Sequence, residues 1–269
     1  MNAGIPKRII QIGRSKDMSL LESGCATNVR LLNPDFKYYF FDNEEKRAFV
    51  EQEFPFYRKV YDSFLFPIQR YDFFRYLAVY KYGGFYLDLD ILLSESLTPL
   101  LNCDCVFAFE ALTLSRFLRN ECGMDWEIGN YAFGATPRHP FIENLIENCI
   151  KSQQDLKWVE TIIAEIPRPF RSEYYVLCTT GPRMVTRTLA ENPALADSIS
   201  ILFPDDVCNE HNWNQFGKYG VHLAYGSWRK HGDYVRRFSA RLWRAWLSRS
   251  LLKESKKIGK TRHGSKNHI

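Results

Sequence analysis

The sequence has 269 residues, of which 45% are hydrophobic, 25% charged and 15% aromatic, so it has the composition of a globular chain with an aromatic-rich core. This length accommodates one large α/β domain or two small ones. No run of 18 apolar residues occurs, and the seven scattered cysteines lack the spacing of zinc ligands. We therefore expect neither a membrane-spanning helix nor a disulfide-stapled scaffold, but a chain with reduced thiols.

Charge is distributed unevenly about a net value of +5. Residues 229–269 contain 13 Lys and Arg against two acids, which leaves 23 basic and 29 acidic residues in 1–228. We therefore predict a folded domain over 1–228 and a separate basic segment over 229–269, with the last dozen residues disordered.

Strands and helices are predicted to alternate through the acidic part of the chain. In order, we expect a strand at 7–12, a strand at 36–42, a helix at 43–54, a helix at 68–82, a strand at 85–93, a strand at 105–110, a helix at 139–152 and a strand at 198–204. This alternation predicts an α/β fold with a mainly parallel sheet flanked by helices.

Two carboxylates interrupt the apolar stretch GGFYLDLDILL. If residues 85–93 form one strand, Asp88 and Asp90 lie on the same face, because side chains alternate along a strand. Adjacent carboxylates repel, and burying either one unpaired is costly. We therefore expect a divalent cation between them.

The preceding helix is expected to bring two more charged residues to the same place. Asp72 lies about 18 Å from the end of the helix at 1.5 Å per residue. Asp88 and Asp90 lie roughly 13–20 Å along the returning strand at 3.3 Å per residue. Arg75 shares a helical face with Asp72, so all four residues are expected to converge on one pocket. The alternative is that Asp72 and Arg75 form an ordinary surface pair.

Six segments carry a resemblance to a known family. IPKRIIQIG, NPDFKYYFFD, RYDFFRYLAVYKYGGFYLDLD, GNYAFGATPRHPF, TGPRMVT and HLAYGSW occur in this order between residues 5 and 228. Together they resemble glycosyltransferase family 32, the Och1-like sugar transferases with a DxD motif, and more distantly the glucosylating bacterial toxins. The resemblance implies a GT-A fold, which is Rossmann-like and binds a nucleotide sugar. It also implies a divalent cation, commonly Mn²⁺ with Mg²⁺ as the alternative, and retention of the anomeric configuration.

The resemblance also implies roles for the residues of the central block. Asp72 and Arg75 would hold hydroxyls of the donor sugar, and Tyr86 would line the nucleotide pocket. Asp88 would contact ribose and sugar hydroxyls, whereas Asp90 would bind the metal. We take Asp72, Arg75, Asp88 and Asp90 as the catalytic candidates.

Four later residues complete the implied donor site. Asn130 matches an Asn near the transferred sugar and the acceptor. His222 and Ser227 match the segment that closes the metal and pyrophosphate site, with Asp88 and Asp90 as the other candidate ligands. Trp228 matches an indole that contacts the leaving phosphate. The alternatives are a core histidine at 222 and a core aromatic at 228. A cation and an indole N–H would both stabilise the charge of a departing nucleoside diphosphate.

Two features depart from the family pattern or leave the mechanism open. The family's first segment usually has His and Trp where this chain has Ile10 and Gly13, and Gly13 cannot stack on a base. A front-face reaction needs no nucleophile. For a double displacement, the candidate nucleophiles are three carboxylates, Glu110, Asp205 and Asp206.

The basic segment places apolar side chains on one broad helical stripe, namely Phe238, Leu242, Trp246, Leu247 and Leu251. Apolar residues surrounded by cations are typical of a helix that lies on an anionic membrane surface, so residues 229–260 are predicted to do so. The alternative is a helix that docks on the protein. Nucleic acid is not an expected partner, because residues 1–228 are acidic and show no binding motif.

We therefore predict a metal-dependent retaining glycosyltransferase that moves a hexose from a nucleotide sugar to a glycan or lipid-linked saccharide. A UDP-sugar is the favoured donor and GDP-mannose the alternative. We expect a role in bacterial capsular or surface polysaccharide synthesis, and a cytoplasmic location peripheral to the inner face of the membrane. The alternatives are a catalytically silent nucleotide-sugar-binding protein, which Gly13 would suit, and a DxD phosphatase, whose motif has Thr or Val where this chain has Leu92.

Overall fold

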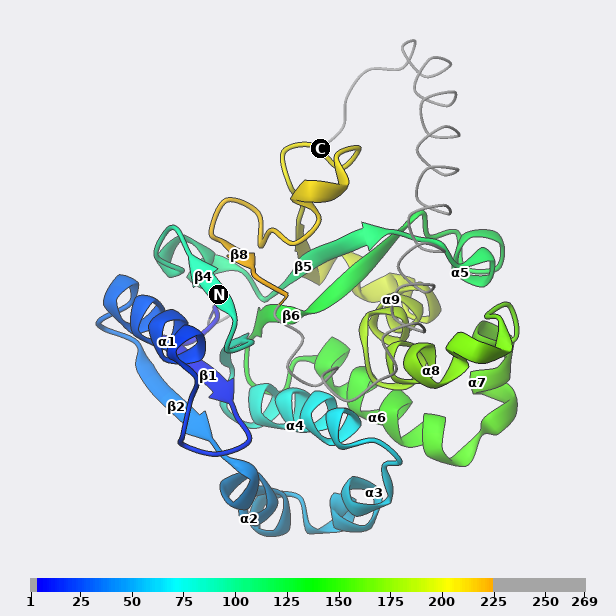
Figure 1. Cartoon of the computed structure of the whole chain (residues 1–269), viewed down its shortest axis with the longest axis horizontal. Helices are drawn as coiled ribbons and strands as arrows, with labels where there is room; N and C mark the ends of the chain where they lie inside the picture. Colours follow the sequence, from blue (N-terminus) through cyan, green and yellow to red (C-terminus); the bar gives the residue numbers. More distant parts are fainter. Residues whose placement is uncertain (1–3, 225–269) are drawn as a thin grey trace.

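Eight strands appear in the computed structural model, which describes residues 4–224 (Figure 1). They are β1 Arg8–Ile12, β2 Lys37–Phe41, β3 Gly84–Leu87, β4 Ile91–Leu93, β5 Cys105–Leu112, β6 Trp126–Ala135, β7 Ile199–Leu202 and β8 Gly220–His222. Six form a mixed sheet in the order β2-β1-β3-β6-β5-β7, and β4 pairs with β8 in a second sheet. Strands β1, β2 and β3 run parallel, as do β5 and β7, whereas β6 is antiparallel to both of its neighbours.

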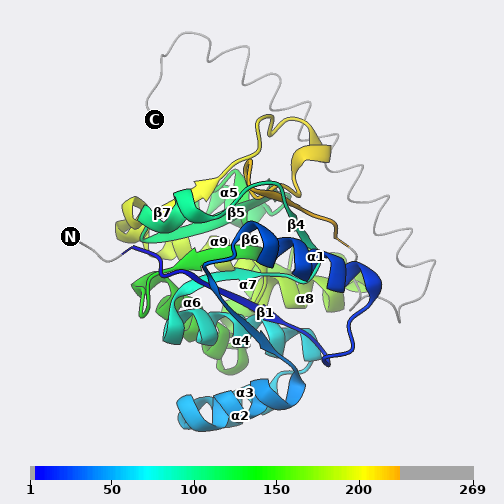
Figure 2. The ribbon, with the colours of Figure 1, turned by 90° about the vertical axis from the view of Figure 1, so that its left-hand side faces the viewer.

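Helices cover both faces of the large sheet. They are α1 Leu20–Leu32, α2 Asn43–Glu53, α3 Arg58–Ser63, α4 Pro67–Tyr82, α5 Arg116–Asn120, α6 Pro140–Gln154, α7 Leu156–Ile163, α8 Arg171–Thr179 and α9 Pro182–Glu191. One apolar cluster joins α2, α4, α6 and α9 to one face, and a second joins α1 and β4 to the other. Figures 1 and 2 show α2 and α3 side by side at one end of the described residues.

Most of the predicted elements are confirmed, but the predicted strand over 85–93 is wrong. The chain leaves the large sheet after Leu87 and turns, because the backbone N–H of Asp88 donates to Tyr131 and that of Ile91 donates back to Asp88. All four residues of β3 are buried, so a charged side chain could not continue the strand inside the sheet. Asp88 and Asp90 therefore lie in a turn at the end of the strand rather than on one strand face.

The predicted return from α4 to β3 is confirmed. Gly83 caps α4 with a φ of +62°, and Gly84 follows with a φ of +102°. A Cβ at Gly84 would lie 2.6 Å from the carbonyl oxygen of Arg8, so the close approach of β3 to β1 also requires glycine. This return places α4 alongside β3, and residues of both elements line the cavity described below.

All seven cysteines are free, in agreement with the prediction of reduced thiols. None of the helices in the described part of the chain is long and apolar enough to span a membrane. The predicted basic helix over 229–260, Ser227 and Trp228 lie outside the described residues.

Candidate functional site

A cavity of about 240 Å³ opens at the ends of β1 and β3. Its lining comes from the end of β1, from α4, from the β3–β4 turn, from β6, and from the segment joining α8 to α9. The lining includes seven residues singled out in the sequence, namely Asp72, Arg75, Tyr86, Asp88, Asp90, Asn130 and His222. Residues far apart in the chain therefore surround one space at the carboxyl ends of two parallel strands, the usual ligand position in such sheets.

Asp72 and Arg75 form a buried pair rather than a surface pair, since each is only 4% exposed. An Nη2 of Arg75 lies 3.0 Å from Oδ1 of Asp72. The Thr180 hydroxyl donates to Oδ2 of Asp72 at 2.7 Å, and the Asn130 amide donates to Oδ1 at 3.2 Å. Burial raises the pKa of Asp72 to about 6, although Arg75 and the Thr180 bond oppose the rise.

Arg75 also connects this pair to Asp88. Its Nη1 lies 3.4 Å from Oδ1 of Asp88 and donates to the carbonyl of Asn130 at 2.8 Å. Burial acts to lower the pKa of Arg75, but Asp88, Tyr86 and Asp72 more than offset it and hold the pKa above its usual value. One guanidinium thus balances two carboxylates of the pocket.

Tyr86 also contacts the carboxylate of Asp88. Its hydroxyl donates to Oδ1 of Asp88 at 2.5 Å, and the Arg75 guanidinium lies 4.6 Å from its ring centroid. The side chain of Gln11 donates to the Asp88 carbonyl at 3.2 Å and accepts from the Tyr38 hydroxyl. These contacts restrict Asp88 to one orientation at the end of β3.

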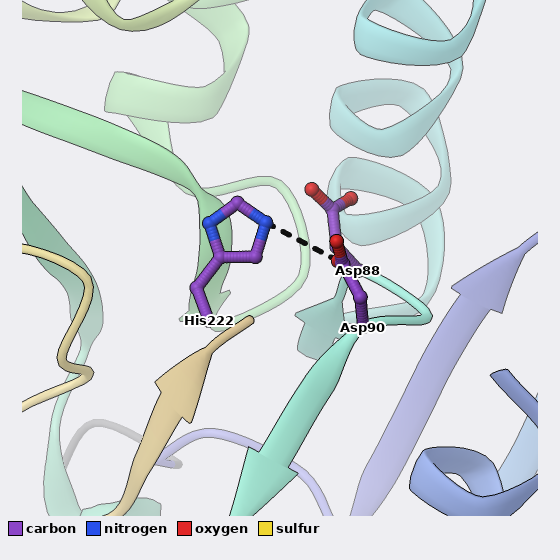
Figure 3. A group of neighbouring side chains, drawn as sticks. All are labelled: Asp88, Asp90 and His222. Atoms are coloured by element: carbon purple, nitrogen blue, oxygen red, sulfur yellow. Dashed lines mark ion pairs between the residues drawn. The ribbon is translucent and has the colours of Figure 1, made fainter. Parts of the chain in front are cut away.

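Asp88, Asp90 and His222 form a candidate metal site (Figure 3). Each offers one ligand atom, and these atoms lie within 4.8 Å of one another. Nε2 of His222 is 3.2 Å from Oδ1 of Asp90. Burial would lower the pKa of His222, but the bond to Asp90 and the charge of Asp88 raise it overall. Two carboxylates and an imidazole are a donor set that suits a divalent ion such as Mn²⁺.

His222 reaches this site through the small sheet. β4 and β8 are antiparallel and pair Ile91 with His222, while the backbone N–H of Leu223 donates to the Asp90 carbonyl at 2.9 Å. The His222 ring stacks on Tyr131, with centroids 4.6 Å apart. A late segment of the chain therefore contributes the third candidate ligand through its pairing with the strand that follows the acidic turn.

Two irregularities in the β5–β6 ladder aim further side chains at the pocket. The register shifts between Phe107 and Ala108, and again between Phe109 and Ala111. The first shift lies opposite Asn130 and Tyr131, and the second coincides with Glu110. β-Bulges redirect side chains in this way and are common near active sites. Of the three candidate nucleophiles, Glu110 lines the pocket, whereas Asp205 and Asp206 are exposed elsewhere.

Sequence reasoning missed several residues of the site. Thr180, Tyr131 and Gln11 contact predicted residues but belong to elements whose positions depend on long-range pairing. The resemblance implies that Asn130 lies near the transferred sugar and the acceptor, and in the structure its amide donates to Asp72 and to the Tyr76 hydroxyl. The structure therefore places Asn130 behind Asp72 as well as at the pocket wall.

Comparisons with known proteins agree with this geometry. Residues 21–107 match the family model described as a glycosyltransferase sugar-binding region containing a DXD motif. Inositol phosphoceramide mannosyltransferase 3 of Schizosaccharomyces pombe is 31% identical over 147 residues, which make up 55% of this chain and 38% of that protein. Inositol phosphoceramide mannosyltransferase 2 of the same organism is 27% identical over 209 residues, covering 75% and 53% respectively. The chain thus spans about half of these relatives or less.

The fold is also found in a solved structure. The UDP-bound glycosyltransferase domain of the YGT toxin superposes with a TM-score of 0.50 at 10% identity, covering 74% of this chain and 80% of that one. The predicted fold class, a GT-A-like mixed sheet flanked by helices, is therefore confirmed.

Proposed function

We propose that the chain transfers a hexose from a nucleotide sugar to a hydroxyl of a saccharide or lipid-linked acceptor, on the premise that residues 21–107 match the model of a glycosyltransferase sugar-binding region containing a DXD motif. The observation that carries the proposal is the cluster of Asp88, Asp90 and His222 beside the buried pair Asp72 and Arg75. A divalent cation held by the cluster would offset the charge that develops on the departing diphosphate.

The residues around the cluster suit the remaining parts of a donor. Asp72 and Arg75 present a carboxylate and a guanidinium, and such groups bind sugar hydroxyls and phosphate oxygens by charge-assisted hydrogen bonds. Because both are buried and fixed by Thr180 and Asn130, they are oriented before the donor arrives. The protein would thus contribute positioning and electrostatics, and the cation would contribute Lewis acidity.

Mannose is the hexose that we propose first. The two relatives described above are named as mannosyltransferases, which favours a mannosyl donor such as GDP-mannose over the UDP-sugar expected from the motifs alone. The names of these relatives also favour a lipid-linked acceptor with a polar headgroup. Retention of configuration, Mn²⁺ as the ion, membrane attachment through residues 229–260 and a role in bacterial surface polysaccharide stay predictions.

The test is release of nucleoside diphosphate from GDP-mannose and a panel of UDP-sugars, with Mn²⁺ or with EDTA. We expect one donor to be turned over only with Mn²⁺, and Asp90→Asn to lose that turnover because the ion loses a ligand. Asp35→Asn, a change at an exposed carboxylate, is the matched control and should retain it. Equal Mn²⁺-dependent turnover in Asp90→Asn would contradict the assignment. Tight donor binding without any turnover would favour the silent binding protein.

A further inference from the structure

The two sides of the pocket differ in chemistry. In the large sheet β3 lies between β1 and β6, so Asp88 at its end has a β1 side and a β6 side. The β6 side is polar, with Asp72 bonded to Asn130 and Thr180. The β1 side is lined by Ile12, Gly13, Arg14, Glu22, Ile68 and Tyr71, so it adds apolar and aromatic groups to one basic and one acidic side chain. A nucleotide sugar that places its diphosphate at the metal cluster would match this division with its sugar on the β6 side and its base on the β1 side, where Tyr71 is the aromatic lining residue.

Position 13 cannot supply an aromatic surface for that base. Gly13 has no side chain, and a Cβ there would lie 2.7 Å from Cζ of Phe40, so a larger residue would have to displace that ring. The β1 side therefore needs another aromatic group if it binds a base by stacking.

Tyr71 lines this side and is held at several points. Its hydroxyl donates to Oδ1 of Asn43 at 2.9 Å, and Nζ of Lys46 lies 3.4 Å from its ring centroid. Lys46 is fully buried, donates to the Gly13 carbonyl at 2.8 Å, and forms no salt bridge within the described residues. The Lys46 amine packs against the ring and helps to fix it in place, with a cation–π attraction when the amine is charged. One face of Tyr71 is thus occupied by Lys46, while the residue borders the pocket.

We infer that Tyr71, supported by Lys46 and Asn43, is the surface on which the donor base stacks in this chain. The inference rests on the proposed function, because it assigns the base end of the same donor site. Stacking of a base on an aromatic side chain contributes about 5- to 150-fold in affinity. This contribution is sequence-tolerant, so the platform would serve a purine or a pyrimidine base alike.

Calorimetric titration with GDP, UDP and inorganic pyrophosphate, each with Mn²⁺, tests the inference. Tyr71→Leu should bind GDP and UDP about 5- to 150-fold more weakly and leave pyrophosphate binding unchanged, because pyrophosphate has no base. Tyr71→Phe keeps the ring and should retain most of the affinity. Tyr39→Leu is the matched control, since Tyr39 also has a lysine over its ring, Lys37 at 4.8 Å, but lies outside the pocket lining.

The support from Lys46 has its own test. Lys46→Met should also weaken GDP binding while pyrophosphate binding stays unchanged, because the ring loses the group packed on its far face. Wild-type affinity for GDP in Tyr71→Leu, or an equal loss of pyrophosphate binding, would overturn the stacking assignment and leave the proposed function intact. Absence of Mn²⁺-dependent nucleotide binding in the wild type would overturn both.

Discussion

Arg75 is the cation on which the buried acids of the pocket depend, so Arg75→Met is expected to destabilise the fold strongly. The variant loses contacts of 3.0 Å to Asp72 and 3.4 Å to Asp88 and a bond to the Asn130 carbonyl. Removing one partner of a buried ion pair costs about 3–5 kcal/mol, because the other charge stays buried and unpaired. We expect a loss in the free energy of unfolding of this size at about pH 7.5.

Arg58→Met provides the matched control. Arg58 also contacts two acids, Asp62 at 2.7 Å and Glu51 at 2.9 Å, but those acids are largely solvent-exposed. Surface pairs contribute at most about 1 kcal/mol, so this variant should unfold at nearly the urea concentration of the wild type.

The pH dependence separates charge from packing. The pKa of Asp72 is raised to about 6 with Arg75 present, and removal of the guanidinium would raise it further. When a carboxyl group has a higher pKa in the folded than in the unfolded state, the protein becomes less stable as the pH rises through the folded-state pKa. The cost of Arg75→Met should therefore shrink at about pH 5, where Asp72 is protonated in both proteins. Equal costs for Arg75→Met and Arg58→Met in urea unfolding, or a cost that does not shrink at low pH, would refute the reasoning.

Three further predictions concern single residues. Burial, with the charge of Arg75, lowers the pKa of Lys46 to about 7. Between about pH 7 and 10.5 the folded state therefore binds fewer protons than the unfolded state, and the free energy of unfolding rises with pH. Lys46→Met should abolish this rise when urea unfolding is compared at about pH 7 and 9. His222→Ala should reduce Mn²⁺ affinity by at least about tenfold in calorimetry, whereas the exposed His211→Ala should not. Gly84→Ala should cost about 2 kcal/mol or more, because its φ is +102° and β1 leaves no room for a Cβ, whereas Gly24→Ala in α1, where the space is open, should stabilise by about 0.5–1 kcal/mol.

The fold could be predicted where local pattern and burial agree. The helix at 67–82 and its glycine stop have a clear start, periodicity and end, and the predicted bounds differ from the observed ones by one residue. β6 was missed because Gly129, Asn130 and Gly134 are typical of turns, and only burial between β3 and β5 makes this segment a strand. The strand predicted over 85–93 failed because apolar alternation does not reveal where a strand changes its partner.

The site shows the same division between local and long-range information. The spacing of Asp72 with Arg75, and of Asp88 with Asp90, places each pair close together by helix or turn geometry alone. His222 and Asn130 could be proposed only through the family resemblance, because no local rule links them to the acidic turn. Thr180 and Tyr131 lie within TGPRMVT and GNYAFGATPRHPF, two segments of the family resemblance, but nothing there singled them out, since a threonine and a tyrosine have many ordinary structural roles.

The small β4–β8 sheet holds His222, the third residue of the candidate metal site, by a shorter ladder than the one that holds β3. Each of its strands has three residues, and it joins positions 91 and 222, which are about half of the chain apart. A ladder this short is only marginally stable by itself, and bringing its two strands together costs the entropy of closing a long loop. We therefore expect it to open locally well before the six-stranded sheet unfolds. A bound cation would link Asp90 to His222 and so stabilise the β4–β8 pairing. The residence time of the cation and the rate at which a diphosphate product leaves would then depend on the same opening event. Turnover in such a site would then be limited by local opening of the three residues of β8 rather than by motion of the large sheet.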